Sequence, residues 1–569
     1  MNAGGPIDLR TIQSSLAQAV DQTHFLTALL RSGMIRMSTP ARLGRSVAAV
    51  RRFGMLGGIV GAAAAQFPDR AALTDELGTL NFQDLDRRSN AVANGWRRRG
   101  LRPGDGVGVL VRNHRGFLDA VFAAAKCGAR IVLLNTDFAA PQLREVMARE
   151  CIDLLVHDDE FSHLLDSVEP SRGRWLAWTD AHTGDTLEAL ITHHPTSPPP
   201  APGVTPRIIL LTSGTTGTPK GAARPEPRSL APIGALLDRV PFRAGETTTL
   251  CPPMFHTLGF AHMMLAVALG STLVVRRRFD PDIVVDSLEH TRSTALVVVP
   301  IMLARIIEHH TRRDRRPDLS ELRIVYVAGS QLGPGLATRA RRTLGPVVYN
   351  MYGSTEVAYA TIATPDDLAC HPDCVGKPVR GVQVRILDEG GRQVPAGETG
   401  RVFVGNPYQS QGYTGGGHKD IVDGLMSSGD IGHFDTAGRL FIDGRDDDMI
   451  VSGGENVFPG EVEELLMAHP AIREACCLGV PDDVYGHRLR AFVALTEHAV
   501  VTADDIRDHV KVSLARYKVP RDVVFLDALP RNATGKVVKR TLATASGFDR
   551  SSGQWPPRLE TAQRDLPGR

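Results

Sequence analysis

Residues 104–158 read GDGVGVLVRNHRGFLDAVFAAAKCGARIVLLNTDFAAPQLREVMARECIDLLVHD. Three short apolar runs (GVGVLV, RIVLLN and IDLLVHD) alternate here with two stretches of helical periodicity, at 116–126 and 141–149. Continuous apolar runs of this length are typical of buried parallel strands, and a helix between two such strands is the crossover that parallel pairing needs. The stretch therefore predicts a βαβαβ unit in an α/β fold with parallel-rich sheets.

Further apolar strands are expected later in the chain, at 208–211, 294–300, 322–330 and 346–353. Ligands of open α/β sheets bind at the carboxyl ends of the strands, and several of these strands run into polar turns that contain glycine. The strand ends after residues 211, 328 and 351 are therefore predicted to converge on one ligand.

The order of these patterns divides the chain into four regions. Residues 1–52 form a helical N-terminal extension, which either packs on the main domain or lies on a membrane surface. Residues 53–444 form a large α/β domain, whose alternating strands and Gly-rich turns from about residue 381 predict a small β-rich subdomain. Residues 445–545 form a small, mobile α+β domain, and residues 546–569 form a loose tail.

Composition excludes several classes of protein. The chain has 569 residues, 42% hydrophobic and 22% charged, which is ordinary for a globular protein of several domains. Lys and Arg number 65 against 63 Asp and Glu, so no broad positive field favours nucleic acid. Seven irregularly spaced cysteines argue for a reducing, cytoplasmic compartment. The longest apolar run, FGMLGGIVGAAAA at 53–65, is too short to span a membrane.

The segment ILLTSGTTGTPKGAA at 209–223 ends a buried strand in small hydroxyl residues, glycines and a lysine. Hydroxyls and close-lying backbone N–H groups suit an anion, and the lysine adds a positive charge. The spacing differs from the P-loop pattern, so the segment is not a Walker NTPase loop. It predicts a pyrophosphate-binding loop made of Thr212, Ser213, Gly214, Thr215, Thr216, Gly217 and Lys220.

Seven segments together resemble the adenylate-forming acyl-CoA synthetases, and among them the long-chain fatty acyl-CoA ligases most. They are LLTSGTTGTPKG (210–221), PPMFHTLGF (252–260), VAGSQL (327–332), YNMYGSTEVA (349–358), SSGDIG (427–432), GRDDDMIVSGGENVFPGEVE (444–463) and LPRNATGKVVKR (529–540). They follow the family's order, and the resemblance covers roughly residues 55 to 543. It implies an ATP-dependent fatty acid–CoA ligase, which forms acyl-AMP and pyrophosphate and then transfers the acyl group to coenzyme A.

The resemblance also implies a role for several of these segments. Glu356 would hold Mg²⁺ with phosphate oxygens, Thr355 would donate to a phosphate, and His256 would border the carboxylate pocket. Adenine and ribose would lie against Gly329, Ser330, Gln331, Asn350, Met351, Tyr352, Gly353, Asp430 and Arg445. The Tyr352 ring would stack on adenine, and the Asp430 carboxylate would accept from both ribose hydroxyls. Ser330-Gln331 departs from the residues that the family often has there.

The C-terminal segments imply a moving part. Lys536 would bridge the attacking carboxylate and the α-phosphate, because one flexible ammonium can neutralise two anions that repel each other. Asp447 would be the hinge between the half-reactions, and Gly453 and Gly454 would let the pantetheine arm pass close to the backbone.

Other interpretations stay open. The acceptor is either coenzyme A or a carrier protein, and the acid is either aliphatic or aromatic. A binding-only relative is disfavoured because Lys536, Glu356 and Asp430 are all present, and an oxygenase on the same fold has no positive sequence support. The acyl tunnel is expected to involve Phe255, Leu258 and Gly259, with Val327 and Ala328 on the facing strand. Homodimer formation and peripheral membrane contact, on the inner face of the membrane, are further expectations.

Overall fold

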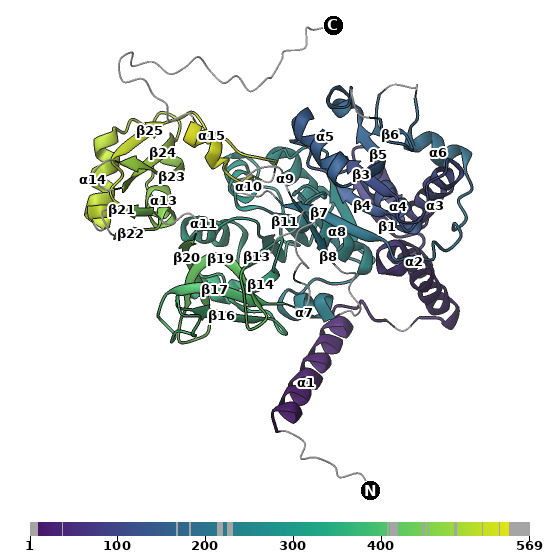
Figure 1. The fold of residues 1–569 in the computed structure, drawn as a ribbon, viewed down its shortest axis with the longest axis horizontal. Helices are drawn as coiled ribbons and strands as arrows, with labels where there is room; N and C mark the ends of the chain where they lie inside the picture. The colour runs from purple at the N-terminus through teal and green to yellow at the C-terminus, as the bar shows by residue number, and fades with distance from the viewer. Residues whose placement is uncertain are drawn as a thin grey trace. The chain divides into compact units, whose positions relative to one another are not determined.

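The structure is a computed structural model of the chain. It describes residues 9–36, 38–166, 169–180, 184–212, 220–224, 231–406, 409, 419–446, 450–452, 455–482, 486–514, 516–533 and 535–544. The chain forms two compact units, coloured along the chain in Figure 1. The first comprises residues 1–447 together with 533–536, and the second comprises 448–532 and 537–569.

A six-stranded sheet in the first unit contains the predicted βαβαβ run. The order of its strands is β6-β5-β3-β4-β7-β8, with every neighbouring pair parallel except β7 and β8. The elements are β3 (Gly106–Leu110), α4 (Arg115–Lys126), β4 (Arg130–Leu133), α5 (Ala140–Arg149), β5 (Ile152–Asp158), β6 (Arg174–Trp178), β7 (Arg207–Thr212) and β8 (Lys220–Arg224). Each of the three strands and two helices predicted from 104–158 is therefore confirmed to within one or two residues.

A second, nine-stranded sheet carries the other predicted strands, in the order β15-β14-β13-β12-β11-β9-β10-β1-β2. Its strands are β1 (Ala71–Asp75), β2 (Gly78–Asn81), β9 (Thr247–Leu250), β10 (Thr272–Val275), β11 (Ala295–Val298), β12 (Ile324–Val327), β13 (Val348–Ser354), β14 (Ala358–Ala363) and β15 (Lys377–Pro378). Pairing is parallel from β1 through β13 and antiparallel at both edges. β12 and β13 are neighbours, so two of the three strand ends expected to converge lie side by side, whereas β7 belongs to the other sheet.

The two faces of strand β12 belong to different parts of the core. Ile324, Tyr326 and Ala328 pack in the cluster that also holds Phe255 and Met263. Val325 and Val327 pack in a second cluster, formed mainly by α9 (Pro281–His290), α10 (Pro300–Arg312) and the strands beside β12. This alternation follows from the two-residue period of a strand.

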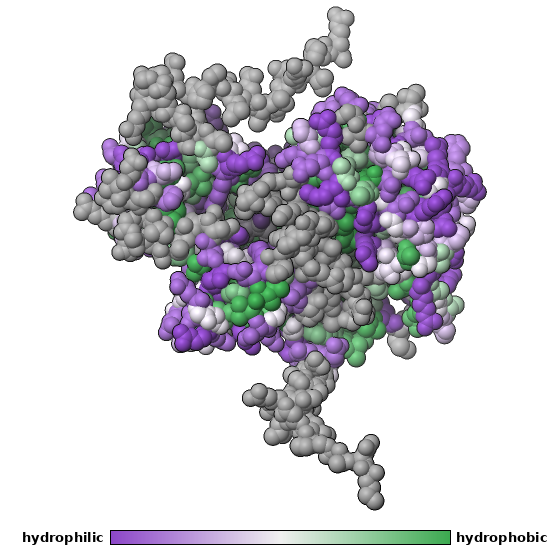
Figure 2. Space-filling view, in the orientation of Figure 1, coloured by the Kyte–Doolittle hydropathy of each residue, from purple (hydrophilic) through white to green (hydrophobic). Residues whose placement is uncertain are grey.

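The small β-rich subdomain expected after residue 381 is an antiparallel sheet of five strands. Its strands are β16 (Gln383–Leu387), β17 (Gly400–Gly405), β18 (Ile421–Val422), β19 (Leu425–Phe434) and β20 (Leu440–Arg445). β19 and β20 place Asp430 and Arg445 directly opposite each other. Polar side chains dominate the face of the first unit that Figure 2 shows, with a few separate apolar areas.

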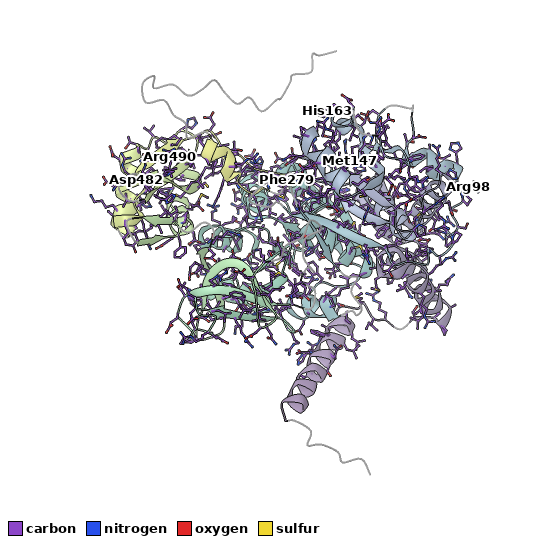
Figure 3. All side chains as sticks on the ribbon, viewed as in Figure 1. Arg98, Met147, His163, Phe279, Asp482 and Arg490 are labelled. Atoms are coloured by element: carbon purple, nitrogen blue, oxygen red, sulfur yellow. The ribbon has the colours of Figure 1, made fainter. Side chains whose placement is uncertain are left out.

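The second unit is an α+β domain, as predicted. Its sheet contains β21 (Ile450–Ser452), β22 (Glu455–Val457), β23 (Ile472–Asp482), β24 (Gly486–Leu495) and β25 (Asp522–Phe525), with helices α13 (Pro459–Met467), α14 (Ala503–Ser513) and α15 (Lys539–Thr544). Arg490, labelled in Figure 3 together with Asp482, donates to Asp522 at 2.8 Å and so ties β24 to β25.

Helices α1 (Leu9–Arg31) and α2 (Pro40–Gln66) precede the sheets. The end of α1 packs on α7 (Ala231–Arg239), with Phe25 and Leu29 buried. Within the described residues, α2 has the length and apolarity of a membrane span. Its chain turns at Gly54, whose φ of 72° is a conformation that favours glycine. The two arms then lie against each other, because the Ser46 hydroxyl bonds Ala62 O and Gln66.

Each arm of this hairpin is shorter than the roughly 20 residues that an apolar helix needs to cross a bilayer. The length of α2 therefore comes from two helices joined at a turn.

Candidate active site

Tyr352 and Asp430 connect the nine-stranded sheet to the antiparallel sheet of β16–β20. Tyr352 lies on β13, and its hydroxyl donates to Asp430 Oδ2 on β19 at 2.5 Å. Asp430 is further held by the pairing of β19 with β20, where Arg445 Nη1 lies 3.4 Å from Asp430 Oδ1. Burial and the Asp430 carboxylate raise the pKa of Tyr352 well above its usual range, so the phenol keeps its proton and donates. The ring was expected to stack on adenine; its hydroxyl also orients Asp430.

Glu356 lies in the turn between β13 and β14. Its carboxylate accepts from the Ser354 hydroxyl at 2.9 Å, and Ser354 in turn accepts from the backbone N–H groups of Glu356 and Val357. Gly353 precedes this turn, and a Cβ there would lie 2.0 Å from Ala358 O. Only glycine therefore allows the chain to approach β14 this closely. Thr355 lies between Ser354 and Glu356 in the same turn and is partly buried.

The remaining predicted nucleotide-binding residues lie on or after β12 and β13. Gly329, Ser330 and Gln331 follow β12 and are exposed. Asn350 is buried and pairs with Val327 of β12, and Met351 next to it is partly buried. These residues therefore lie on, or directly after, two neighbouring strands inside the nine-stranded sheet.

Lys536 belongs to a short segment grouped with the first unit. The residue is exposed, yet its pKa is lowered, first by partial desolvation of its ammonium and second by the positive charge of Arg445. The carboxylates of Glu356 and Asp430 act in the opposite direction. The charges of Arg445, Glu356 and Asp430 thus all influence Lys536, although these residues are far apart in the sequence.

His256 immediately precedes helix α8 (Thr257–Ala268) and lies near the same group of charges. Burial, and next the positive charge of Lys536, lower its pKa to about 3, so the imidazole is neutral. Its Nε2 is buried and makes no hydrogen bond to any residue that the structure describes. The Phe255 ring packs against it with the centroids 4.8 Å apart.

Asn113 holds the segment in front of His256, and the sequence analysis missed it. Its amide donates to Pro252 O at 2.9 Å, and its Oδ1 accepts from the Met254 N–H at 2.7 Å. Asn113 follows the buried strand β3, so it ties the two large sheets together. A polar residue shortly after a buried strand was the available signal.

Val327 and Gly259 were both expected to line the acyl tunnel, and the structure gives each of them a packing role. Val327 packs in the cluster on the far side of β12, because adjacent residues of a strand point to opposite faces. A Cβ at Gly259 would lie 2.2 Å from Pro253 O, so this glycine serves the close packing of α8 on residues 253–254. Phe255 and Ala328 share one core cluster, against which Leu258 packs. The neighbour of Ala328 on that face is Tyr326.

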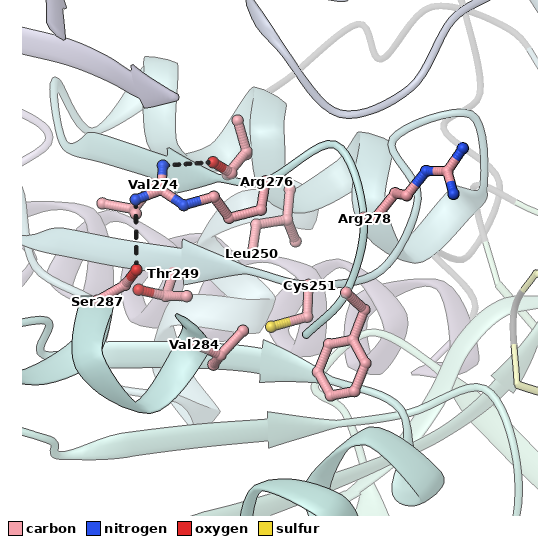
Figure 4. A pocket seen from close by; sticks show the side chains of 10 residues that line it. Thr249, Leu250, Cys251, Val274, Arg276, Arg278, Val284 and Ser287 are labelled. Carbon is pink, nitrogen blue, oxygen red and sulfur yellow. Dashed lines mark hydrogen bonds between the residues drawn. The ribbon is translucent and has the colours of Figure 1, made fainter. Parts of the chain in front are cut away.

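Figure 4 shows a small pocket beside β9 and β10 that contains none of the predicted site residues. Two guanidinium groups line it. That of Arg276 donates to Val275 O at 3.3 Å and to the Ser287 hydroxyl at 3.5 Å, and that of Arg278 donates to Glu160 at 2.9 Å. Both charged groups are therefore bonded within the protein. The candidate active site is therefore placed at the charged residues around Lys536 and not at this pocket.

Several predicted residues lie outside the described residues: Ser213, Gly214, Thr215, Thr216, Gly217, Asp447, Gly453 and Gly454. The backbone of Thr212 ends β7, and that of Lys220 begins β8; the two pair in register across the loop.

The family profile of the AMP-binding enzymes matches residues 60–414, more than half of the chain. The chain belongs to the AMP-binding enzyme family. The profile of this family's C-terminal domain matches residues 461–536. Membership of this adenylate-forming family confirms the resemblance seen in the sequence and makes the chain an AMP-forming ligase.

Curated relatives of this AMP-binding enzyme include ligases with different acids and acceptors. A fatty acid–[acyl-carrier-protein] ligase of Streptomyces coeruleorubidus is 30% identical over 84% of this chain and 93% of its own length. A feruloyl-CoA synthase of an Amycolatopsis species is 31% identical over 83% of this chain and 95% of its own.

Among solved structures, the o-succinylbenzoate CoA synthetase of Bacillus subtilis, in complex with its acyl-adenylate, has a TM-score of 0.73. It is 26% identical and covers 85% of this chain and 97% of its own. The amide bond synthetase of Marinactinospora thermotolerans has a TM-score of 0.74 at 27% identity, covering 88% of this chain and 99% of its own. The large α/β domain with a small C-terminal domain is thus the architecture of known adenylate-forming enzymes.

Proposed function

We propose that this chain activates a carboxylic acid with ATP and transfers the acyl group to coenzyme A. In the first half-reaction the carboxylate attacks the α-phosphorus, which forms acyl-AMP and releases pyrophosphate. In the second, the thiol of coenzyme A displaces AMP and forms a thioester. The observation that carries the proposal is the arrangement around Asp430, which accepts from Tyr352 at 2.5 Å and lies 3.4 Å from Arg445. Lys536 belongs to the same group of charges, because Arg445, Glu356 and Asp430 all influence its pKa.

Asp430 is proposed to accept hydrogen bonds from the ribose hydroxyls. Its Oδ2 already accepts from Tyr352 and its Oδ1 faces Arg445, so its two oxygens are held in a defined orientation before nucleotide binds. Preorganised groups of this kind cost no rearrangement during the reaction.

Lys536 is proposed to carry most of the electrostatic stabilisation of the first half-reaction. The attacking carboxylate and the α-phosphate are both negative, and an ammonium between them lowers the cost of their approach. The neutral imidazole of His256, beside Lys536, adds no second positive charge that would compete for the same anions.

Glu356 fits a magnesium ion. Mg²⁺ is held by one or two carboxylates together with phosphate oxygens and water, and the described residues offer here one carboxylate and no cluster of three metal-binding side chains. Bound there, the ion would neutralise charge on the phosphates. The hydroxyl of Ser354 fixes the orientation of the Glu356 carboxylate through its 2.9 Å hydrogen bond.

The acid is proposed to be a fatty acid, as the form of the GGENVFPGEVE segment indicates. An aromatic acid is the second candidate, and one observation favours it: Tyr326 rather than Val327 lines the face next to Ala328. Relatives named for feruloyl-CoA and for a fatty acid loaded on a carrier protein support both acids and both acceptors.

A pyrophosphate- and AMP-release assay over a panel of fatty and aryl acids, with and without coenzyme A, tests the proposal. Acyl-AMP formation with at least one acid, and thioester formation on adding coenzyme A, are expected. Turnover only with an added carrier protein would overturn the assignment of coenzyme A. No pyrophosphate release with any acid would overturn the function itself.

The outer arm of the hairpin, residues 40–53, is proposed to contact the inner face of a membrane. Leu43 and Val47 are 56% and 42% exposed, and Arg45 and Arg51 have no carboxylate partner among the described residues. Such a mixture suits an anionic lipid surface. Sedimentation with phosphatidylglycerol vesicles, lost in R45E/R51E, is expected; equal sedimentation of both proteins would contradict the proposal.

A further inference from the structure

The short segment that carries Lys536 is held in the first unit by a hydrogen bond. Residues 533–536 belong to this unit, although the chain on both sides of them belongs to the second. The N–H of Ala533 donates to Asp137 Oδ2, across 396 positions of the sequence. Ala533 lies three residues before Lys536, so this bond fixes the backbone that leads to the ammonium.

Gly535, directly before Lys536, packs closely on the same unit. Its φ of 78° is a conformation that favours glycine. A Cβ at this position would lie 2.5 Å from Ile301 Cγ2 and 3.2 Å from Val299 Cγ2, two residues at the start of α10. The segment is therefore held at two points, by a hydrogen bond at Ala533 and by packing at Gly535.

The backbone around Asp137 is itself fixed. Asp137 lies in the turn after strand β4, where its N–H donates to Asn135 Oδ1 at 2.9 Å. A side chain that accepts from the backbone two residues on is a common way to stabilise a turn. The next residue, Phe138, is buried in the core. Asp137 is exposed, so a rigid turn presents its carboxylate at the surface.

We infer that Asp137 is a positioning residue for the first half-reaction, because its carboxylate holds segment 533–536 and thereby places the ammonium of Lys536. This inference rests on the proposed function and adds a residue to it. A catalytic group that is misplaced by about 1 Å can lose about 10²-fold in rate. The charges that shift the pKa of Lys536 come from other residues, so Asp137 is expected to act through its hydrogen bond.

Stabilisation of helix α5 is the alternative role for this carboxylate. Asp137 lies three residues before α5, and a negative charge near a helix N-terminus stabilises the helix. Such a role would lower the thermal midpoint and weaken both half-reactions alike. Positioning of Lys536 affects only the formation of acyl-AMP, so the two half-reactions distinguish the two roles.

The test measures the two half-reactions separately in the full chain, with the acid that the wild type activates best. Asp137→Ala is expected to slow pyrophosphate release in a single turnover by about tenfold, with KM for ATP unchanged, because a hydrogen bond to a charged group is lost. Asp137→Asn, whose amide oxygen can accept from the Ala533 N–H, is expected to keep most of the wild-type rate. Thioester formation from supplied acyl-AMP and coenzyme A is expected to stay at the wild-type level in both variants.

A double-mutant cycle shows whether Asp137 acts through Lys536. If it does, adding Asp137→Ala to Lys536→Ala is expected to slow acyl-AMP formation no further.

Asp159 provides a matched control. It is also exposed and also follows a strand of the six-stranded sheet, and its carboxylate accepts from the hydroxyls of Ser162 at 2.9 Å and Thr179 at 3.1 Å. Asp159→Ala is expected to keep the wild-type rate of acyl-AMP formation.

Three outcomes overturn the inference: a wild-type rate of acyl-AMP formation in Asp137→Ala, equal slowing of both half-reactions in this variant, or a further tenfold loss when it is added to Lys536→Ala. If Asp137→Ala does not fold, Asp137→Ser, which also removes the carboxylate, takes its place. Each of these outcomes leaves the proposed function intact. Absence of pyrophosphate release by the wild type with every acid would instead sink the proposed function.

Discussion

The hydroxyl of Tyr352 donates to Asp430 at 2.5 Å and so connects strand β13 of the nine-stranded sheet to strand β19 of the antiparallel sheet. The two residues are 78 positions apart in the chain. Their bond holds the carboxylate proposed to bind ribose, and it leads to the first prediction.

Tyr352→Phe removes this donor and keeps the ring. Hydrogen bonds to charged groups contribute about 1.5–3 kcal/mol, so KM for ATP should rise about 10- to 100-fold in a pyrophosphate-exchange assay. Tyr349→Phe, on the same strand, is the control and should stay near the wild-type value. An unchanged KM in Tyr352→Phe would mean that Asp430 does not depend on this bond.

Lys536→Ala removes the ammonium that Glu356 and Asp430 stabilise. Acyl-AMP formation should fall by about 10²-fold or more, the scale seen when one donor to a developing charge is lost. Thioester formation from supplied acyl-AMP should largely survive. Lys511→Ala, at an exposed lysine of α14, should affect neither step. Equal loss of both half-reactions would contradict the role of Lys536.

Gly353→Ala places a Cβ 2.0 Å from Ala358 O, so β13 and β14 must separate. Overpacking of this kind costs about 1–3 kcal/mol, and the displaced turn carries Glu356. A lower thermal midpoint and weaker pyrophosphate exchange are expected together. Gly335→Ala in α11 (Pro334–Leu344), where no atom lies within 4 Å of the added Cβ, should lower neither. A Gly353→Ala enzyme with wild-type stability would refute the clash.

His262 should make the folded protein less stable in acid. Its pKa is about 4 when folded and about 6.5 when unfolded, so between these values the unfolded chain binds more protons. Stability is therefore lost as pH falls from about 6.5 towards 4, by up to about 2 kcal/mol at pH 5. The fall in thermal midpoint from pH 7 to pH 5 should be smaller in His262→Gln than in the wild type.

The control for this pH dependence is His163→Gln, at the exposed histidine labelled in Figure 3. It should follow the wild-type curve, because its histidine is not buried. Parallel curves for all three proteins would show that His262 is not the group responsible.

Local sequence patterns were sufficient to predict the strands and helices of the first βαβαβ run. Strands β3, β4 and β5 and helices α4 and α5 could be predicted within one or two residues, because buried parallel strands and amphipathic helices leave distinct periods in the sequence. The ordered motifs were likewise sufficient for the family. Both are properties of neighbouring residues along the chain.

Only the tertiary structure decided which side chains meet. It showed that the Tyr352 hydroxyl bonds Asp430, that Asn113 holds the segment before His256, and that Tyr326 rather than Val327 shares a face with Ala328. These contacts join strands of different sheets or depend on the register of one strand against a helix. A shift of one residue turns a strand's side chains to the opposite face, so they are settled only when the sheets pack.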